Sequence, residues 1–130
     1  MKFIFLLSGI LLFAFYNAAA QPAFNDNGKT MDILKKAYNC EAIEYENWTE
    51  DDATDSCLTV CLVNSDKVPS KSNLEELVNQ LKHIALSVKS ALVTPEDYNS
   101  FYIIFVKKEI VFGNITRSHS AGGVIPGAEL

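Results

Sequence analysis

The fold is decided by residues 72–92, which read SNLEELVNQLKHIALSVKSAL. Apolar residues recur there at intervals of three and four, a spacing typical of a helix that buries one face. They are Leu74, Leu77, Val78, Leu81, Ile84, Ala85, Val88, Ala91 and Leu92. Ser72 and Glu75 fit a capping box at the start, and Pro95 disfavours helical geometry just before it. Such a helix would be about 31 Å long, enough to cross a small sheet.

The segments around this helix predict the sheet that it crosses. Residues 41–48 alternate, with Ile43 and Tyr45 on one side and Glu44 and Glu46 on the other, which indicates a half-buried strand. Residues 57–64 form the next strand, and because both of its faces are rather apolar we expect it to be central. The two faces are Leu58, Val60 and Leu62, against Cys57, Thr59, Cys61 and Val63.

After the long helix, an aromatic and β-branched run predicts two further strands. We place them at about 101–110 and 114–120, with the turn at Gly113-Asn114 and with Lys107-Lys108 as the alternative turn. Near the other end, Thr30 is expected to cap a short helix through Asn39.

The elements therefore follow the order αββαββ. This order favours an α+β domain with a mostly antiparallel four-stranded sheet and the long helix packed on one face. We expect residues 29–120 to form this single domain, preceded by a flexible leader at 21–28 and followed by a flexible tail at 121–130.

Residues 1–20 are expected to be a signal peptide. A single basic residue, Lys2, precedes an apolar run from Phe3 to Phe15, and Ala18-Ala19-Ala20 fits a cleavage site before Gln21. The run is short for a bilayer span, which needs about 20 residues, so we predict an exported, periplasmic or secreted protein without a stable membrane span after cleavage.

Removal of that segment would leave 110 residues with 10 basic and 16 acidic side chains, a net charge of −6. An acidic chain of this kind is not expected to bind nucleic acid or anionic membranes. The sequence also lacks a phosphate-binding glycine loop and a nucleophile elbow.

The three cysteines, Cys40, Cys57 and Cys61, suggest a disulfide in an oxidising compartment. Cys57 and Cys61 would lie about 13 Å apart on one strand face, too far to bond, so Cys40 has to be one partner. We predict Cys40–Cys61, while Cys40–Cys57 and three unpaired, buried cysteines stay open as alternatives.

The other candidate groups give no catalytic or metal-binding pattern, so no cofactor is expected. His83 has no His or carboxylate three or four residues away on its helix, and His119 lies at a polar strand end. The acidic residues between Glu41 and Asp55 lack the calcium-loop spacing, which favours a solvated edge. Asn47 and Asn114 begin glycosylation sequons that matter only in a eukaryotic host. Tyr45 and Trp48 could form an interaction patch near a loop.

Three features together resemble small, uncharacterised exported proteins of Bacteroidetes-type bacteria, over about the last half of the chain. They are the Ala18-Ala19-Ala20-Gln21 end of the signal, the long helix, and the hairpin around Tyr98, Phe105-Val106 and Gly113. The resemblance implies no activity, and a eukaryotic secreted origin stays open.

From size and the missing catalytic set, we expect a non-enzymatic binding or interaction module for an unidentified protein or small ligand. Two alternatives remain: a structural or stress-related envelope protein, and a thiol-dependent enzyme using Cys57 or Cys61.

Overall fold

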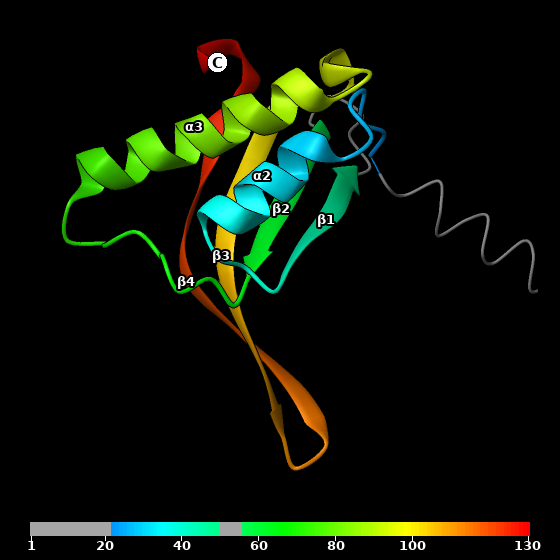
Figure 1. Cartoon of the computed structure of the whole chain (residues 1–130). Helices are drawn as coiled ribbons and strands as arrows, with labels where there is room; N and C mark the ends of the chain where they lie inside the picture. The colour runs from blue at the N-terminus through cyan, green and yellow to red at the C-terminus, as the bar shows by residue number, and fades with distance from the viewer. Residues whose placement is uncertain (1–21, 50–55) are drawn as a thin grey trace, which may run out of the picture.

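The computed structural model describes residues 22–49 and 56–130. The expected signal peptide at 1–20, together with Gln21 and residues 50–55, lies outside these ranges. The described elements are α2 (Lys29–Ala37), β1 (Ala42–Thr49), β2 (Ser56–Val63), α3 (Leu74–Ala91), η1 (Pro95–Asp97), β3 (Ser100–Val111), β4 (Asn114–Pro126) and η2 (Gly127–Glu129) (Figure 1). The α+β class is confirmed, and the predicted order αββαββ fits in part, because the short helical turns η1 and η2 are added to the described helices and strands.

The long helix, α3, buries the face that its spacing predicts. Its buried residues are Leu77, Leu81, Ile84, Ala85, Val88 and Ala91. It has 18 residues rather than 21, because Asn73 is the N-cap: its side chain accepts a hydrogen bond of 3.2 Å from the backbone N–H of Glu76. The predicted Ser72–Glu75 capping box is therefore wrong, because the N-cap lies one residue later. Pro95 follows the end of α3 and is the first residue of η1.

The four strands form one sheet in the order β1-β2-β3-β4, with β2 and β3 in the centre. The β1–β2 and β3–β4 pairs are antiparallel, as expected, but β2 and β3 are parallel. The expectation of a mostly antiparallel sheet thus holds for two of the three strand pairs. The parallel pair arises because α3 carries the chain back along the sheet before β3 begins, as a crossover helix does.

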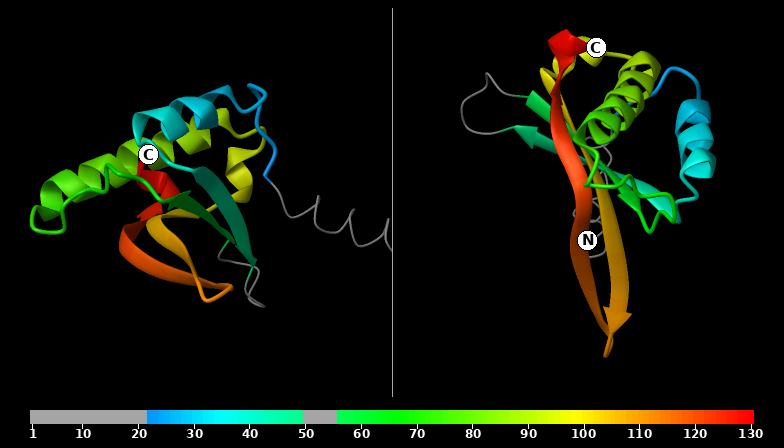
Figure 2. Two further views of the ribbon diagram at one scale, coloured as in Figure 1. Left: turned by 60° about the horizontal axis from the view of Figure 1, so that its bottom comes forward. Right: turned by 90° about the vertical axis from the view of Figure 1, so that its left-hand side faces the viewer.

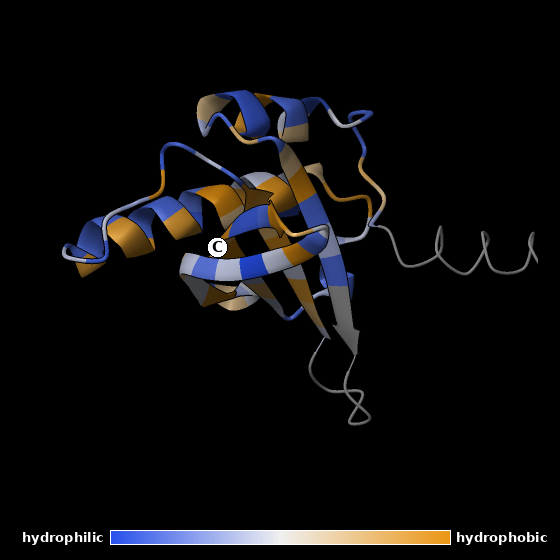
Figure 3. Cartoon of the chain, turned by 90° about the horizontal axis from the view of Figure 1, so that it is seen from below, coloured by the Kyte–Doolittle hydropathy of each residue, from blue (hydrophilic) through white to orange (hydrophobic). Residues whose placement is uncertain are grey.

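Both helices cover the same face of the sheet (Figure 2). The α3 helix packs against β3 and β4, and α2 packs against α3 and β1. Phe101 and Phe105 are fully buried between the layers, and the ring of Tyr38 meets Phe105 edge-on at 5.6 Å. In Figure 3 apolar and polar residues alternate along α3 and the strands, the pattern that places one side of each element in the core.

The segment expected to be a flexible leader is part of the fold from residue 22 onward. Phe24 forms a β-bridge with Leu92, and its ring packs on Tyr45 with centroids 5.4 Å apart. The Asp26 carboxylate accepts hydrogen bonds from the backbone of Gly28 and Thr30, at 3.1 and 2.9 Å. Asp26, rather than Thr30, therefore serves the N-terminus of α2, which ends at Ala37 rather than Asn39.

The expected tail at 121–130 is also wrong, because β4 continues to Pro126 and η2 follows it. Ala121 and Ile125 are buried on the face of the sheet that packs against α3. The domain boundary predicted at residue 120 therefore falls inside a strand. The ladder is irregular there: Phe105 pairs with Ala121, but Val106 pairs with His119. Ser120 is the extra residue of this β-bulge, a feature that bends a strand.

The turn of the β3–β4 hairpin lies at Phe112-Gly113, one residue before the preferred Gly113-Asn114. Lys107 and Lys108, the alternative turn, are paired within β3. Phe112 and Gly113 both have positive φ, 50° and 78°, as in the tight two-residue turns that suit twisted strands. The hairpin extends well beyond the rest of the described structure (Figure 1).

Candidate functional site

The sheet face opposite the helices carries a hollow of about 420 Å³, which we call the open-face hollow. It is lined from β1, β2, β3 and β4, by Glu46, Cys57, Thr59, Cys61, Tyr102, Ile104, Val106, Arg117, His119 and Val124. The sequence predicts that the second face of β2 is rather apolar. It does not predict that residues of β4 line the same surface.

The floor of the hollow follows from strand alternation and from the parallel register. Thr59 pairs with Tyr102 and Cys61 with Ile104, so these side chains stand beside one another on the same face. Thr59, Cys61, Ile104 and Val106 are all buried although no described helix covers this face. The floor is therefore a closely packed, mainly apolar surface.

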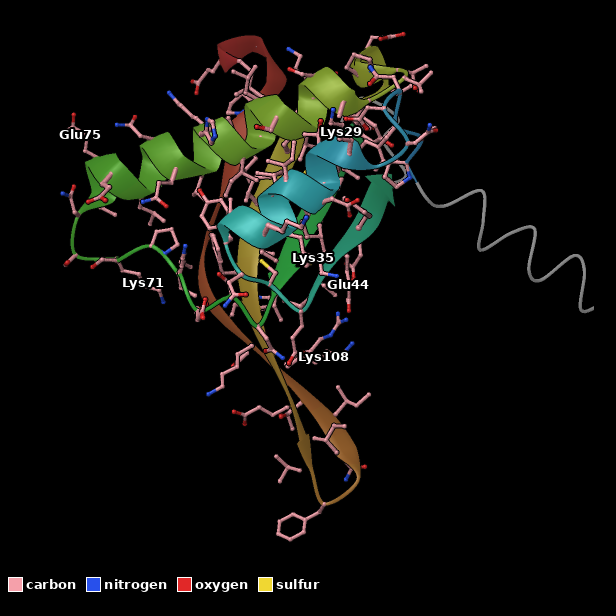
Figure 4. The ribbon with its side chains drawn as sticks, in the orientation of Figure 1. Lys29, Lys35, Glu44, Lys71, Glu75 and Lys108 are labelled. Carbon is pink, nitrogen blue, oxygen red and sulfur yellow. The ribbon has the colours of Figure 1, made fainter. Side chains whose placement is uncertain are left out.

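We call four charged side chains at or beside the edge of the hollow the rim: Glu46 and Arg117 line it, and Glu44 and Lys108 are joined to them through ion pairs. Glu44 accepts a hydrogen bond from Lys108 at 3.1 Å and another from Arg117, and Arg117 also lies 3.8 Å from Glu46. Figure 4 shows Glu44 and Lys108 on the same side, where the hairpin leaves the sheet. Burial by itself raises the pKa of Glu44, but the Lys108 hydrogen bond and the charges of Arg117 and Lys108 outweigh it and lower that pKa. The rim therefore carries compensated charges at neutral pH.

The three cysteines are free, and the predicted Cys40–Cys61 disulfide is not present. The register of β1 and β2 places Glu44, not Cys40, opposite Cys61. Cys40 belongs to the core under the helices, whereas Cys61 packs in the cluster on the other face. Ala42 lies opposite Val63 at the open end of the β1–β2 ladder, so Cys40, two residues before Ala42, does not come opposite Cys61.

The structure brings Cys57, Cys61 and His119 to one hollow, a grouping that their sequence separation does not suggest. Burial is the main reason why the pKa of the Cys61 thiol is raised; the Glu46 charge adds to this and Arg117 opposes it. Burial likewise raises the pKa of Cys40. Because the thiolate is the nucleophilic form of cysteine, these environments do not activate either thiol.

The proposed Tyr45 and Trp48 patch is only half described. Tyr45 lies on the helix-covered face, packed on the core and on Phe24, and its pKa is raised by burial and by the Asp32 charge. Tyr45 is therefore half-buried against the core. The backbone of Trp48 belongs to β1, but its side chain lies outside the described part of the chain.

A second hollow, of about 460 Å³, lies between the two helices and includes His83. It is lined by Thr30, Ile33, Leu34, Ala37, Tyr38, Lys67, Gln80, His83 and Ser87. Most of these residues are exposed or half-buried, so this groove lacks a continuous buried apolar floor.

No group of three or more potential metal ligands occurs among residues 22–49 and 56–130. Within the same ranges, none of the helices is both long and apolar enough to cross a bilayer. Of the acidic residues considered as a cation site, Glu44 and Glu46 pair with basic side chains, and residues 50–55 are not described.

Comparison of the chain with family models, with curated proteins and with solved structures gave no significant match.

Proposed function

We propose that this chain is an exported, non-enzymatic binding module that holds a small, uncharged and mainly apolar molecule in the open-face hollow. The observation that carries the proposal is the buried apolar floor of β2 and β3 on a face that no described helix covers. Binding sites for small molecules commonly combine such a floor with a few polar groups at its edge.

The size of the hollow supports a small ligand. Its volume of about 420 Å³ lies within the roughly 300–1,000 Å³ of typical small-molecule sites. An apolar molecule placed there would remove its own surface and the exposed side chain of Val124 from water, and this is the main favourable contribution to such binding.

The paired charges at the rim support an uncharged ligand. Arg117 already interacts with Glu44 and Glu46, and Lys108 with Glu44. An ionised ligand would have to compete with these partners or remain without one, and an unpaired charge is costly to remove from water. Tyr102, Thr59 and His119 are then the groups available to orient a neutral ligand through hydrogen bonds.

The thiol-dependent enzyme is the less favoured reading, because the pKa of Cys61 is raised rather than lowered. In the proposal Cys57 and Cys61 act as parts of the wall, and no covalent step is assigned to them.

The test is a fluorescence titration with the neutral apolar dye phenylnaphthylamine. We expect saturable binding to the wild-type chain, and about tenfold weaker binding to Val124→Lys, because a charge at the rim opposes entry of an apolar body. Val93→Lys is the matched control, since Val124 and Val93 are 57% and 55% exposed and only Val124 lines the hollow. Its affinity should stay within about twofold of wild type.

A second variant, Cys57→Trp, tests the same site by filling it, and should also weaken dye binding while the far-ultraviolet circular dichroism spectrum is retained. Absence of saturable binding to the wild-type chain would contradict the proposal and favour a structural envelope protein. Equal affinity of all variants would place the dye elsewhere and would contradict the assigned site.

A further inference from the structure

The β3–β4 hairpin ends in a group of exposed apolar residues that do not line the open-face hollow. We call Ile110, Val111, Phe112 and Ile115 the tip; their exposed fractions are 77%, 42%, 100% and 63%. Soluble proteins seldom gather large apolar side chains at the end of a projecting element unless something covers them.

The hairpin is anchored to the body as far as Lys108. The side chain of Asn64, just after β2, accepts from the backbone N–H of Lys108 at 2.8 Å and donates to its carbonyl at 3.0 Å. These bonds extend the β2–β3 pairing to Lys108, and beyond it β3 pairs only with β4. The apolar residues thus lie beyond the last bond to the β2 side of the sheet and away from the core (Figure 1).

Phe112 occupies a backbone conformation that its side chain does not favour. Its φ is 50°, a region where asparagine and glycine are usual and a bulky residue is an outlier. Asn-Gly would suit this two-residue turn better than Phe-Gly. A fully exposed aromatic side chain at a strained position contributes little to folding, which points to a use outside the chain.

The apolar side chains of the tip point in several directions, so they suit an apolar medium that can surround the tip. Ile110 and Ile115 are cross-strand partners and share one face of the hairpin, whereas Val111 lies on the opposite face beside its partner Asn114, and Phe112 lies at the end. A protein partner that docks on one face of the hairpin would leave the apolar side chain on the other face exposed to water. A lipid interface can surround the whole tip.

The charges behind the tip form what we call the collar. It consists of three ion-paired cations, Lys107, Lys108 and Arg117, with their acidic partners Glu44, Glu46 and Glu109. Cations and anions balance, so the collar can enter the polar head-group region without requiring anionic lipid. Phe112 follows Lys108 by four residues, or about 13 Å along an extended chain. Interfacial amphipathic helices bury their apolar faces by roughly 5–10 Å, so this reach is more than enough to place the tip in the interface while the collar stays at the head groups.

From these observations we infer that the tip inserts reversibly into the interface of a zwitterionic phospholipid membrane, with Phe112 leading and the collar at the head groups. The backbone of the tip stays at the interface, because unpaired strand edges are not tolerated in the hydrocarbon region. This inference rests on the hairpin alone and is independent of any ligand in the open-face hollow.

The experiment is flotation with phosphatidylcholine vesicles, using a chain that begins at Gln21 so that the apolar run at Phe3–Phe15 cannot itself bind lipid. All described elements lie within this chain. We expect Phe112→Asn to reduce the partition coefficient at least about tenfold while the hairpin turn becomes more favourable, so that unfolding does not explain the loss. Leu74→Ser, which removes another exposed apolar side chain, 69% exposed at the start of α3, is the control and should change partitioning less than about twofold.

A second readout locates the insertion. In Trp48→Phe/Phe112→Trp the single tryptophan should be quenched by brominated phosphatidylcholine and its emission should shift to shorter wavelength on binding. Partitioning should be nearly unchanged by salt. Wild-type binding that requires anionic lipid, Phe112→Asn binding like wild type, or a wild-type dimer that Phe112→Asn dissociates without any lipid binding would each overturn the inference.

Discussion

Glu44 joins the β3–β4 hairpin to the edge strand β1. It lies on β1, and it binds Lys108 of β3 and Arg117 of β4, so one carboxylate joins three strands. The predicted alternation of residues 41–48 places Glu44 on the side away from Ile43 and Tyr45, as found. Its basic partners could not be predicted, because they come from strands that are distant in sequence and depend on a bulge.

Glu44→Gln should destabilise the fold by about 0.5–1 kcal/mol near neutral pH, a value limited by the partial solvent exposure of the pairs. The pKa of Glu44 is lowered in the fold from its ordinary 4.5. Its stabilising contribution is therefore complete above that value and is lost as the pH falls through the folded-state pKa. Urea unfolding of both chains across this range should show the two stabilities converging in acid.

The control for this experiment is Glu96→Gln, which changes an exposed glutamate of η1 outside the collar. It should leave stability nearly unchanged at every pH. A difference between wild type and Glu44→Gln that stays constant down to strongly acidic pH would show that the carboxylate charge is not responsible.

At the scale of elements, helix ends and strand ends were the least predictable parts. The periodicity of residues 74–91 is enough to identify the buried face of α3, because packing depends on spacing rather than on the first residue. The end of β4 was missed because Gly122 and Gly123 interrupt an alternation that continues from Ala121 to Ile125. A Cβ atom at Gly122 would lie 2.8 Å from the Ile103 carbonyl oxygen, so glycine there reflects close strand approach and not a mobile tail.

The start of α3 gives a direct test of which residue caps it. Asn73→Ala should lower the free energy of unfolding by about 1 kcal/mol, since the backbone N–H of Glu76 loses its side-chain acceptor. Ser72→Ala should change it by less than about 0.5 kcal/mol, because the Ser72 hydroxyl shares a hydrogen bond of 2.6 Å with the exposed Ser70 hydroxyl and not with the backbone of the first helical turn. Thermal or urea unfolding measures the free energy of unfolding of both variants. A larger loss for Ser72→Ala than for Asn73→Ala would contradict Asn73 as the N-cap and support the capping box at Ser72.

For the molecule as a whole, local patterns identified four strands and two helices but not how the two halves meet. The parallel β2–β3 pair joins segments on either side of α3, and no turn signal encodes it. That pair sets Thr59 beside Tyr102 and Cys61 beside Ile104, and so creates the floor of the open-face hollow. The site therefore could not be found before the strand order was known.

The central claim is that the open-face hollow is the binding site, and amide chemical-shift mapping during titration with phenylnaphthylamine tests it most directly. We predict that the shifts concentrate at Thr59, Cys61, Ile104 and Val124, while Thr30 and Gln80 of the groove between the helices stay unchanged. Shifts confined to the helix groove, or no saturable shift at any of these residues, would contradict the account.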